Sequence, residues 1–217
     1  MRRRVTITFD NGPTPEVTSY VLDCLARNDV PATFFVVGRK ASSPEGAAIL
    51  QRASEEGHCI GNHTFTHTTP LGELERDAGL REFEQAEQAL AWLKQPKRLF
   101  RPYGRGGTLG RPPHSSRGRR EVARRALSVR ALESVPEDWR DPEGWVERAL
   151  SDCRSRPWSL VVLHDLPTGA MMRLERFLLV LREEDVDVTQ DYPLECVPFA
   201  DGKILQAMDQ FVAQTGV

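Results

Sequence analysis

Thr8-Phe9-Asp10-Asn11-Gly12-Pro13 ends a run of β-branched and aromatic apolar residues that begins at Val5. The run predicts a strand, and Gly12-Pro13 is expected to end it before a helix begins near Pro15. A carboxylate at the carboxyl end of an early strand is a common place for chemistry in α/β proteins. By itself, however, the stretch also reads as ordinary turn sequence. The rest of the chain decides between the two interpretations.

Strand and helix patterns alternate about seven times after this stretch. The expected strands cover residues 5–10, 32–37, 58–62, 97–103, 127–133, 159–164 and 186–189. The expected helices begin near Pro15, cover 44–56 and 71–93, follow residue 118, begin at Pro142, and cover 171–182 and 204–212. This alternation predicts one parallel α/β domain over residues 1–217. Residues 105–118, rich in Gly, Pro, Arg and Ser, form a candidate binding loop.

Polar side chains stand just past the ends of successive predicted strands. They are Asp10, His63 and His67, Arg101, Asp138 and Trp139, and His164. In a barrel these ends converge on one face, whereas in an open sheet they are spread along an edge. No glycine-rich phosphate fingerprint follows the first strand, which weakens a nucleotide-binding interpretation.

Composition excludes several other classes of protein. The formal net charge of −2 gives no electrostatic case for binding nucleic acid or an anionic membrane. No run of about 18 apolar residues is present to span a membrane, and no signal-peptide core follows the basic start. The four cysteines are far apart and are expected to be reduced. We therefore expect a cytoplasmic protein, unless the sequence is a domain of a longer exported chain.

His63 and His67 form the most specific local motif. Two imidazoles four residues apart share one face of a helical turn, a geometry that chelates a divalent metal. The alternative is a pair of polar surface or capping residues. A metal held by two histidines needs a further oxygen ligand, and Asp10-Asn11 is the expected source.

Five segments match one family in order: Thr8–Pro13, His63–His67, Phe100–Gly104, Asp138-Trp139 and Leu163–Asp165. On these segments the chain resembles the NodB-homology polysaccharide deacetylases. These are metal-dependent enzymes that remove N- or O-acetyl groups from chitin, peptidoglycan and related sugars. The resemblance covers residues 5 to 190. It implies an α/β fold, a distorted (β/α) barrel with about seven parallel strands.

The resemblance also implies roles for individual residues. Asp10 would be the general base, His164 the general acid, and Arg101 the partner of the base. The backbone N–H of Tyr103 would help to bind the oxyanion. Metal ligands would be His63, His67 and Asn11. Trp139, Asp138 and Val162 would line the substrate pocket.

Two positions depart from the family pattern. Asn11 stands where the family has a metal-binding Asp; its neutral amide oxygen can still bind a metal, but with weaker expected affinity. Val135 stands where the family has the first Asp of the fourth segment, interpreted as the residue that orients the catalytic His. Glu133 is a candidate replacement, whereas Asp165 should point to the opposite face of its strand.

We therefore expect a hydrolase of carbon–nitrogen bonds that removes acetyl groups from an amino sugar with the help of a divalent metal. Zinc is the first expectation, with cobalt, manganese or nickel as alternatives. Two other hypotheses stay open. One is the same chemistry on another non-peptide C–N bond of a small molecule; the other is a catalytically impaired homologue that binds glycans.

Overall fold

The central strand of the sheet is β1 (Arg4–Asp10), in which Val5 to Asp10 are all buried. In this computed structural model, which describes residues 2–74, 76–95, 97–103, 127–128, 134–200 and 203–204, β1 has three parallel neighbours. Strand β6 (Trp158–His164) pairs along its whole length. On the other side, β7 (Asp187–Thr189) pairs with the first half of β1 and β2 (Thr33–Val36) with the second half.

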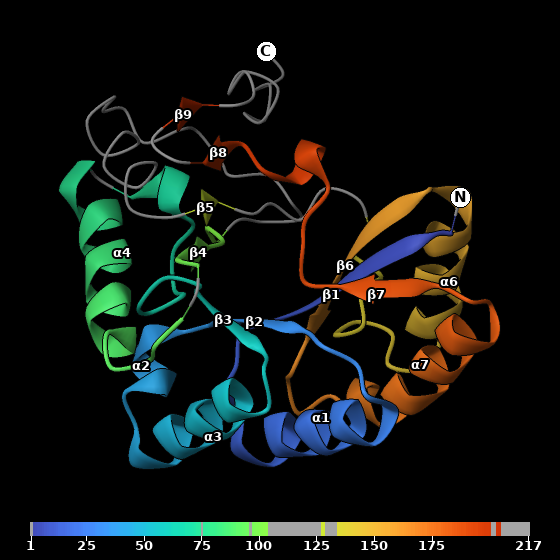
Figure 1. Ribbon diagram of the computed structural model, residues 1–217. Coiled ribbons are helices and arrows are strands. Elements are labelled where there is room, and N and C mark those ends of the chain that lie inside the picture. The colour runs from blue at the N-terminus through green and yellow to red at the C-terminus, as the bar shows by residue number, and fades with distance from the viewer. Residues whose placement is uncertain are drawn as a thin grey trace.

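The sheet continues from β2 in the order of the chain (Figure 1). The remaining strands are β3 (Cys59–Asn62), β4 (Leu99–Phe100), β5 (Leu127–Ser128), β8 (Phe199–Ala200) and β9 (Lys203–Ile204). Strands β1 to β7 make parallel pairs, whereas β8 and β9 are antiparallel. A bridge between Ser134 and Val161 connects the segment after β5 to β6, at the other end of the strand order. The expected distorted (β/α) barrel with about seven parallel strands is confirmed.

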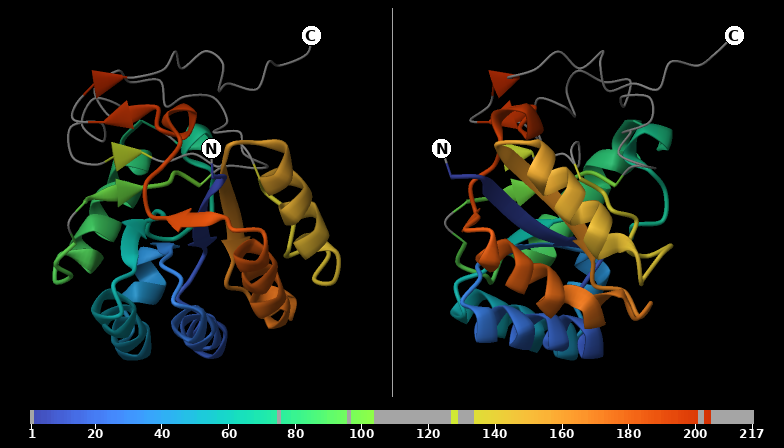
Figure 2. Two further views of the ribbon diagram at one scale, coloured as in Figure 1. Left: turned by 45° about the vertical axis from the view of Figure 1, so that its right-hand side comes forward. Right: turned by 90° about the vertical axis from the view of Figure 1, so that its right-hand side faces the viewer.

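Helices surround the sheet on its outer side (Figures 1 and 2). The α-helices are α1 (Pro15–Asn28), α2 (Gly38–Ala41), α3 (Pro44–Glu55), α4 (Arg76–Leu90), α6 (Trp145–Ser155) and α7 (Leu174–Glu183). The 3-10 turns are η1 (Leu71–Glu73), η2 (Ala170–Arg173) and η3 (Leu194–Cys196). No described helix has the length and apolar character that a membrane crossing requires.

Apolar side chains divide between two sides of the sheet. The larger cluster joins the outer face to α1, α3, α6 and α7 and includes Phe9, Phe34 and Trp145. A smaller cluster includes Phe35 and Val162. Because successive residues of a strand point to opposite faces, Phe34 and Phe35 belong to different clusters. The nearly continuous apolar runs of β2 and β6 follow from this burial on both faces, whereas β1 alternates apolar residues with buried Thr6, Thr8 and Asp10.

Several boundaries differ from the sequence-based expectations. The helix expected over 71–93 is interrupted: η1 ends at Glu73 and α4 begins at Arg76. The short helix α2 was not expected. Of the strand expected over 127–133, the structure describes residues 127–128, which form β5. The candidate loop at 105–118, the basic helix after it and most of the helix expected over 204–212 lie outside the described residues.

Substitution of two glycines by alanine tests the packing, because the free energy of unfolding is expected to change in opposite directions. A Cβ at Gly61, in β3, would lie 2.7 Å from the Phe35 ring and 3.0 Å from the Leu99 Cβ. A Cβ at Gly79, in α4, would meet nothing closer than 3.7 Å. We predict that Gly61→Ala lowers the free energy of unfolding by about 1–3 kcal/mol. Gly79→Ala should raise it by up to about 1 kcal/mol.

Urea unfolding of the two variants and the wild type measures both changes. A Gly61→Ala variant as stable as the wild type would contradict the close approach of β3 to the Phe35 ring.

Candidate active site

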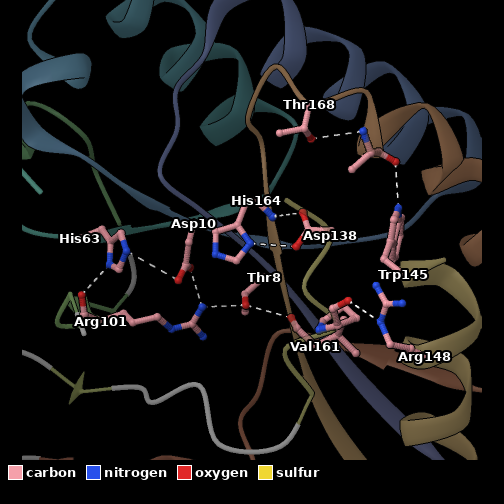
Figure 3. Close-up of polar contacts among 12 residues, drawn as sticks. Thr8, Asp10, His63, Arg101, Asp138, Trp145, Arg148, Val161, His164 and Thr168 are labelled. Atoms are coloured by element: carbon pink, nitrogen blue, oxygen red, sulfur yellow. Dashed lines mark hydrogen bonds and ion pairs between the residues drawn. The ribbon is translucent and has the colours of Figure 1, made fainter. Parts of the chain in front are cut away.

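The carboxyl ends of the parallel strands gather the candidate catalytic residues at one end of the sheet (Figure 3). Asp10 ends β1, His164 ends β6, and these two residues are direct neighbours in the β1–β6 register. His63 follows β3, and Arg101 follows β4. Four side chains that are far apart in the sequence therefore meet at one site, as expected for a barrel.

Asp10 and Arg101 form a buried ion pair; their side chains are only 7% and 3% exposed. The Arg101 Nη1 donates to Asp10 Oδ1 at 2.6 Å and to Thr8 Oγ1 at 2.8 Å. Thr8 Oγ1 in turn donates to the Val161 carbonyl at 3.0 Å. Burial alone would raise the pKa of Asp10, but Arg101, with His63 and His164, more than offsets it and holds the pKa below its usual value. Asp10 is therefore an ionised carboxylate.

Asp138 holds His164. Its carboxylate accepts hydrogen bonds from His164 Nδ1 and from the His164 backbone N–H, both at 2.9 Å. Burial would lower the pKa of His164, yet the hydrogen bond and the charge of Asp138 raise it above its usual value. With Nδ1–H committed to Asp138, Nε2 is the nitrogen left to exchange a proton with a substrate.

This contact corrects two sequence-based expectations. Asp138 was expected in the substrate pocket, but it is fully buried behind His164. The absence of an Asp at Val135 therefore does not leave His164 without a carboxylate; Val135 packs against the smaller apolar cluster. Glu133, the suggested replacement, lies outside the described residues. The position of Asp138 directly before Trp139, in a segment that matches the family, was the sequence feature that could have identified it as the orienting residue.

His63 and His67 come together, but not on a helix. Residues 63–70 form irregular turns, and His67 has a positive φ of 54°. The two rings lie 4.8 Å apart between centroids, and the Tyr103 ring stacks on His67 at 3.8 Å. His63 is only 4% exposed, so the alternative of two polar surface residues is wrong for it. The segment that follows β3, not a helical turn, produces the pair.

Hydrogen bonding leaves His63 with a free lone pair on Nε2. Its Nδ1 lies 2.7 Å from the Arg101 carbonyl, which can only accept, so Nδ1 carries the proton. Burial lowers the pKa of His63, and burial together with His63 lowers the pKa of His67 to about 3. Both imidazoles are therefore neutral, the form that binds metals.

The donor set fits a divalent cation. His63 Nε2 and Asp10 Oδ2, both acceptors, lie 3.7 Å apart. Asn11 Oδ1 is a buried oxygen with no hydrogen-bond partner in the described structure. Among the described residues, no group of three His, Cys, Asp or Glu side chains suited to a metal occurs, so that part of the chain shows no third ligand of these types beside the two histidines. The Asn11 amide oxygen, at the residue after Asp10, is the candidate for a further ligand.

The turn that carries Asn11 is held from three elements. Asn11 has a φ of 78°, a conformation that Asn tolerates better than most residues. Lys40 Nζ, in α2, donates to the Asn11 carbonyl at 2.7 Å. Asp165, after β6, lies so close that a Cβ at Gly12 would be 2.1 Å from its Oδ2. Thr18, in α1, donates to the same Asp165 carboxylate, whose pKa burial raises to about 7.

Apolar groups border the site. The Trp139 ring lies edge-on to His164, with centroids 4.5 Å apart. Val162 is 2% exposed, in the same cluster as Phe35, and shares a strand face with His164. Asp165, as expected, points away from His164. The supporting contacts of Thr8 and Lys40 were not foreseen: Thr8 lies in the first matched segment but was assigned no role, and nothing in the local sequence marks Lys40.

Comparison with known proteins identifies the family of this chain. The family model described as polysaccharide deacetylase matches residues 1–117. The chain belongs to this family. The peptidoglycan-N-acetylglucosamine deacetylase PgdA of Listeria monocytogenes is 27% identical over 213 residues. That alignment covers 98% of this chain but 42% of the relative, so this chain spans less than half of its length.

Two further proteins are similar to the chain. The chitooligosaccharide deacetylase of Rhizobium leguminosarum bv. trifolii is 32% identical, and the alignment covers 75% of this chain and 72% of the relative. The structure of a family 4 acetyl xylan esterase from Clostridium thermocellum, in complex with a cobalt ion, has a TM-score of 0.70 and 25% identity. That match covers 86% of this chain and 87% of the other. These similarities agree with the fold and with the expected family.

The contact between Asp138 and His164 predicts a specific change in titration. Asp138→Asn removes the negative charge, so we expect the pKa of His164 to fall. NMR titration of the His164 ring in the two proteins measures the shift directly. Because the folded-state pKa is raised above 6.5, the contact stabilises the fold fully below that pH and less as pH rises through the raised value. An unchanged pKa in the variant would contradict this role of Asp138.

Proposed function

We propose that this chain is a metal-dependent deacetylase that hydrolyses the N-acetyl group of an amino sugar within an oligosaccharide or polysaccharide. One observation carries the proposal. A buried carboxylate with a lowered pKa, Asp10, ends the strand beside that of a histidine with a raised pKa, His164. Two neighbouring groups whose pKa values are shifted in opposite directions are suited to act as base and acid.

Hydrolysis of an amide requires a deprotonated water, stabilisation of an oxyanion and a proton for the departing amine. Asp10 accepts the proton of the water, and Arg101 keeps this carboxylate ionised and oriented. His164 donates a proton from Nε2 to the amine nitrogen, and Asp138 stabilises the imidazolium before the transfer. The amine then leaves with that proton, and acetate is released.

His63, His67 and Asn11 would hold the divalent metal. A bound metal lowers the pKa of its water and polarises a carbonyl. Zinc is the proposed ion, with cobalt, manganese and nickel as alternatives, and cobalt is the ion bound to the similar acetyl xylan esterase. Since Asn11 supplies a neutral oxygen where a carboxylate would add a charge, the proposed site binds metal less tightly than one with Asp.

The acetyl group is proposed to bind between Trp139 and Val162, next to His164. The backbone N–H of Tyr103 is proposed to donate to the oxyanion. The names of the relatives support the substrate class, because one acts on peptidoglycan N-acetylglucosamine and another on chitooligosaccharides. We propose a sugar polymer, and not a small amide, as the substrate.

A glycan-binding protein without activity is the competing function. Two departures from the family pattern, at Asn11 and Val135, favoured it. Asp138 accepts two hydrogen bonds from His164, the proposed general acid. The departure at Val135 therefore no longer favours an inactive protein. Asn11 alone remains, and its unpaired oxygen is still a possible ligand.

The proposal predicts that the purified protein, loaded with zinc or cobalt, releases acetate from N-acetylglucosamine oligomers. A chelator should abolish the release. Asp10→Asn should lower kcat/KM by about 10²–10⁴-fold, because the amide cannot accept a proton. Asp29→Asn, at an exposed residue with a positive φ that Asn also tolerates, is the matched control and should leave the rate unchanged.

Full activity of Asp10→Asn, or acetate release that resists chelation, would exclude this mechanism. A panel that includes small acetylated amides separates the two enzymatic hypotheses. Binding of the oligomers without turnover by any metal-loaded form would favour the glycan-binding function.

A second prediction concerns Asn11 alone. Asn11→Asp should bind zinc more tightly, by about 10–100-fold, because a carboxylate replaces a neutral oxygen in the donor set. Competition with a chromophoric chelator measures the affinity, and His63→Ala establishes that the titration reports on this site. Equal affinities of Asn11→Asp and wild type would contradict a role for Asn11 as a ligand.

A further inference from the structure

The loop that carries the two histidines has an unfavourable backbone conformation. Thr64 and His67 have φ angles of 69° and 54°, in the left-handed region that L residues avoid. Thr64 is β-branched, for which this region is especially unfavourable. Such residues persist only where the surrounding structure fixes them. The contacts that fix this loop therefore determine where His63 and His67 lie.

Neighbouring groups bind several backbone groups of this loop. The carbonyls of Thr64 and Phe65 accept from the first two N–H groups of α2, those of Gly38 and Arg39, both at 2.9 Å. The Thr64 N–H donates to the side chain of Asn62 at 2.8 Å. These contacts leave the N–H groups of Phe65 and Thr66, which point toward α4.

Glu82, from α4, binds these two groups. Its Oε2 accepts from the Phe65 N–H at 3.0 Å and from the Thr66 N–H at 2.8 Å. Its Oε1 accepts from the Thr66 hydroxyl at 2.9 Å. One carboxylate thus makes three hydrogen bonds to two successive residues midway between His63 and His67. These three hydrogen bonds connect the loop to α4 at its middle.

Helix α4 is itself fixed at this point. Phe83, the next residue, is fully buried, and its ring packs edge-on against Phe100 of β4, with centroids 5.0 Å apart. The Phe83 carbonyl and Glu87 both accept from Asn62, the last residue of β3. These contacts hold α4, and with it Glu82, against β3 and β4.

We propose that Glu82 is a positioning residue that sets the geometry of the His63–His67 pair, and hence the affinity of the site for its metal. This inference rests on the proposed function only in taking the two histidines as metal ligands. Glu82 binds Phe65 and Thr66 and so acts on the histidines through the backbone of these two residues.

Metal affinity tests the inference without any assay of turnover. Glu82→Ala removes all three hydrogen bonds, whereas alanine favours the helix, so we expect a folded variant with zinc affinity reduced by about 10–100-fold. Glu82→Gln is the conservative variant. Its amide oxygen can accept from both N–H groups and its amide N–H can donate to the Thr66 hydroxyl, so it should bind zinc like the wild type. Gln85→Ala, on the exposed face of α4, is the control.

Hydrogen exchange of the Phe65 and Thr66 amides gives a second measurement, and exchange should be faster in Glu82→Ala only. If Glu82→Ala does not fold, Glu82→Asp, whose carboxylate is one methylene short of the loop, replaces it. Wild-type affinity in the folded variant, or equal losses in the Ala and Gln variants, would overturn the inference. A wild type that binds zinc through His63 but releases no acetate contradicts the proposed function alone. A wild type that binds no zinc contradicts both.

Discussion

The buried ion pair between Asp10 and Arg101 connects the fold to the site. Removing two charges from water is costly, and only close geometry with further hydrogen bonds offsets the cost. Here Arg101 Nη1 also binds Thr8, whose hydroxyl binds the Val161 carbonyl, so the pair connects β1, β4 and β6. Loss of either partner would leave an uncompensated charge inside the barrel. Arg101, whose charge keeps Asp10 ionised, thus also links the strands that carry the site.

The site divides into two halves with opposite electrostatics. On one side a guanidinium faces a carboxylate and lowers the pKa of Asp10; on the other a carboxylate faces an imidazole and raises the pKa of His164. Both groups are largely buried, so these shifts depend on named neighbours, with Arg101 the first for Asp10 and Asp138 the first for His164, and not on the net charge of the protein. The β1–β6 register places the two groups as neighbours. Their complementary roles follow from pairing each with its own buried counter-charge.

The strands and their ends were predictable from the sequence, whereas the contacts between them were not. The patterns at β1, β2 and β6 predicted nearly the observed bounds, because strands that are buried on both faces are rich in β-branched and aromatic residues. The assignment of Asp138 to the substrate pocket failed because its partner, His164, lies 26 residues away in the sequence. Sequence separation alone does not show which residues are close in space. The His63–His67 spacing suggested a helical turn, but a loop held by α2 and α4 forms instead. Tertiary hydrogen bonds overrode the local pattern there.

Positive φ angles locate the parts of the chain where support matters most. Of the six described non-glycine residues with positive φ, Asn11, Thr64, His67 and Glu137 are site residues or lie beside one. Regular strands place the backbone near the site, but the proposed metal ligands Asn11 and His67 and the orienting residue Asp138 lie in turns after those strands, at or beside a residue with positive φ. Each such turn requires polar groups from another element: Lys40 for Asn11, and α2 with Glu82 for the histidine loop. Substitutions at these supports therefore change the chemistry while every residue of the site stays the same.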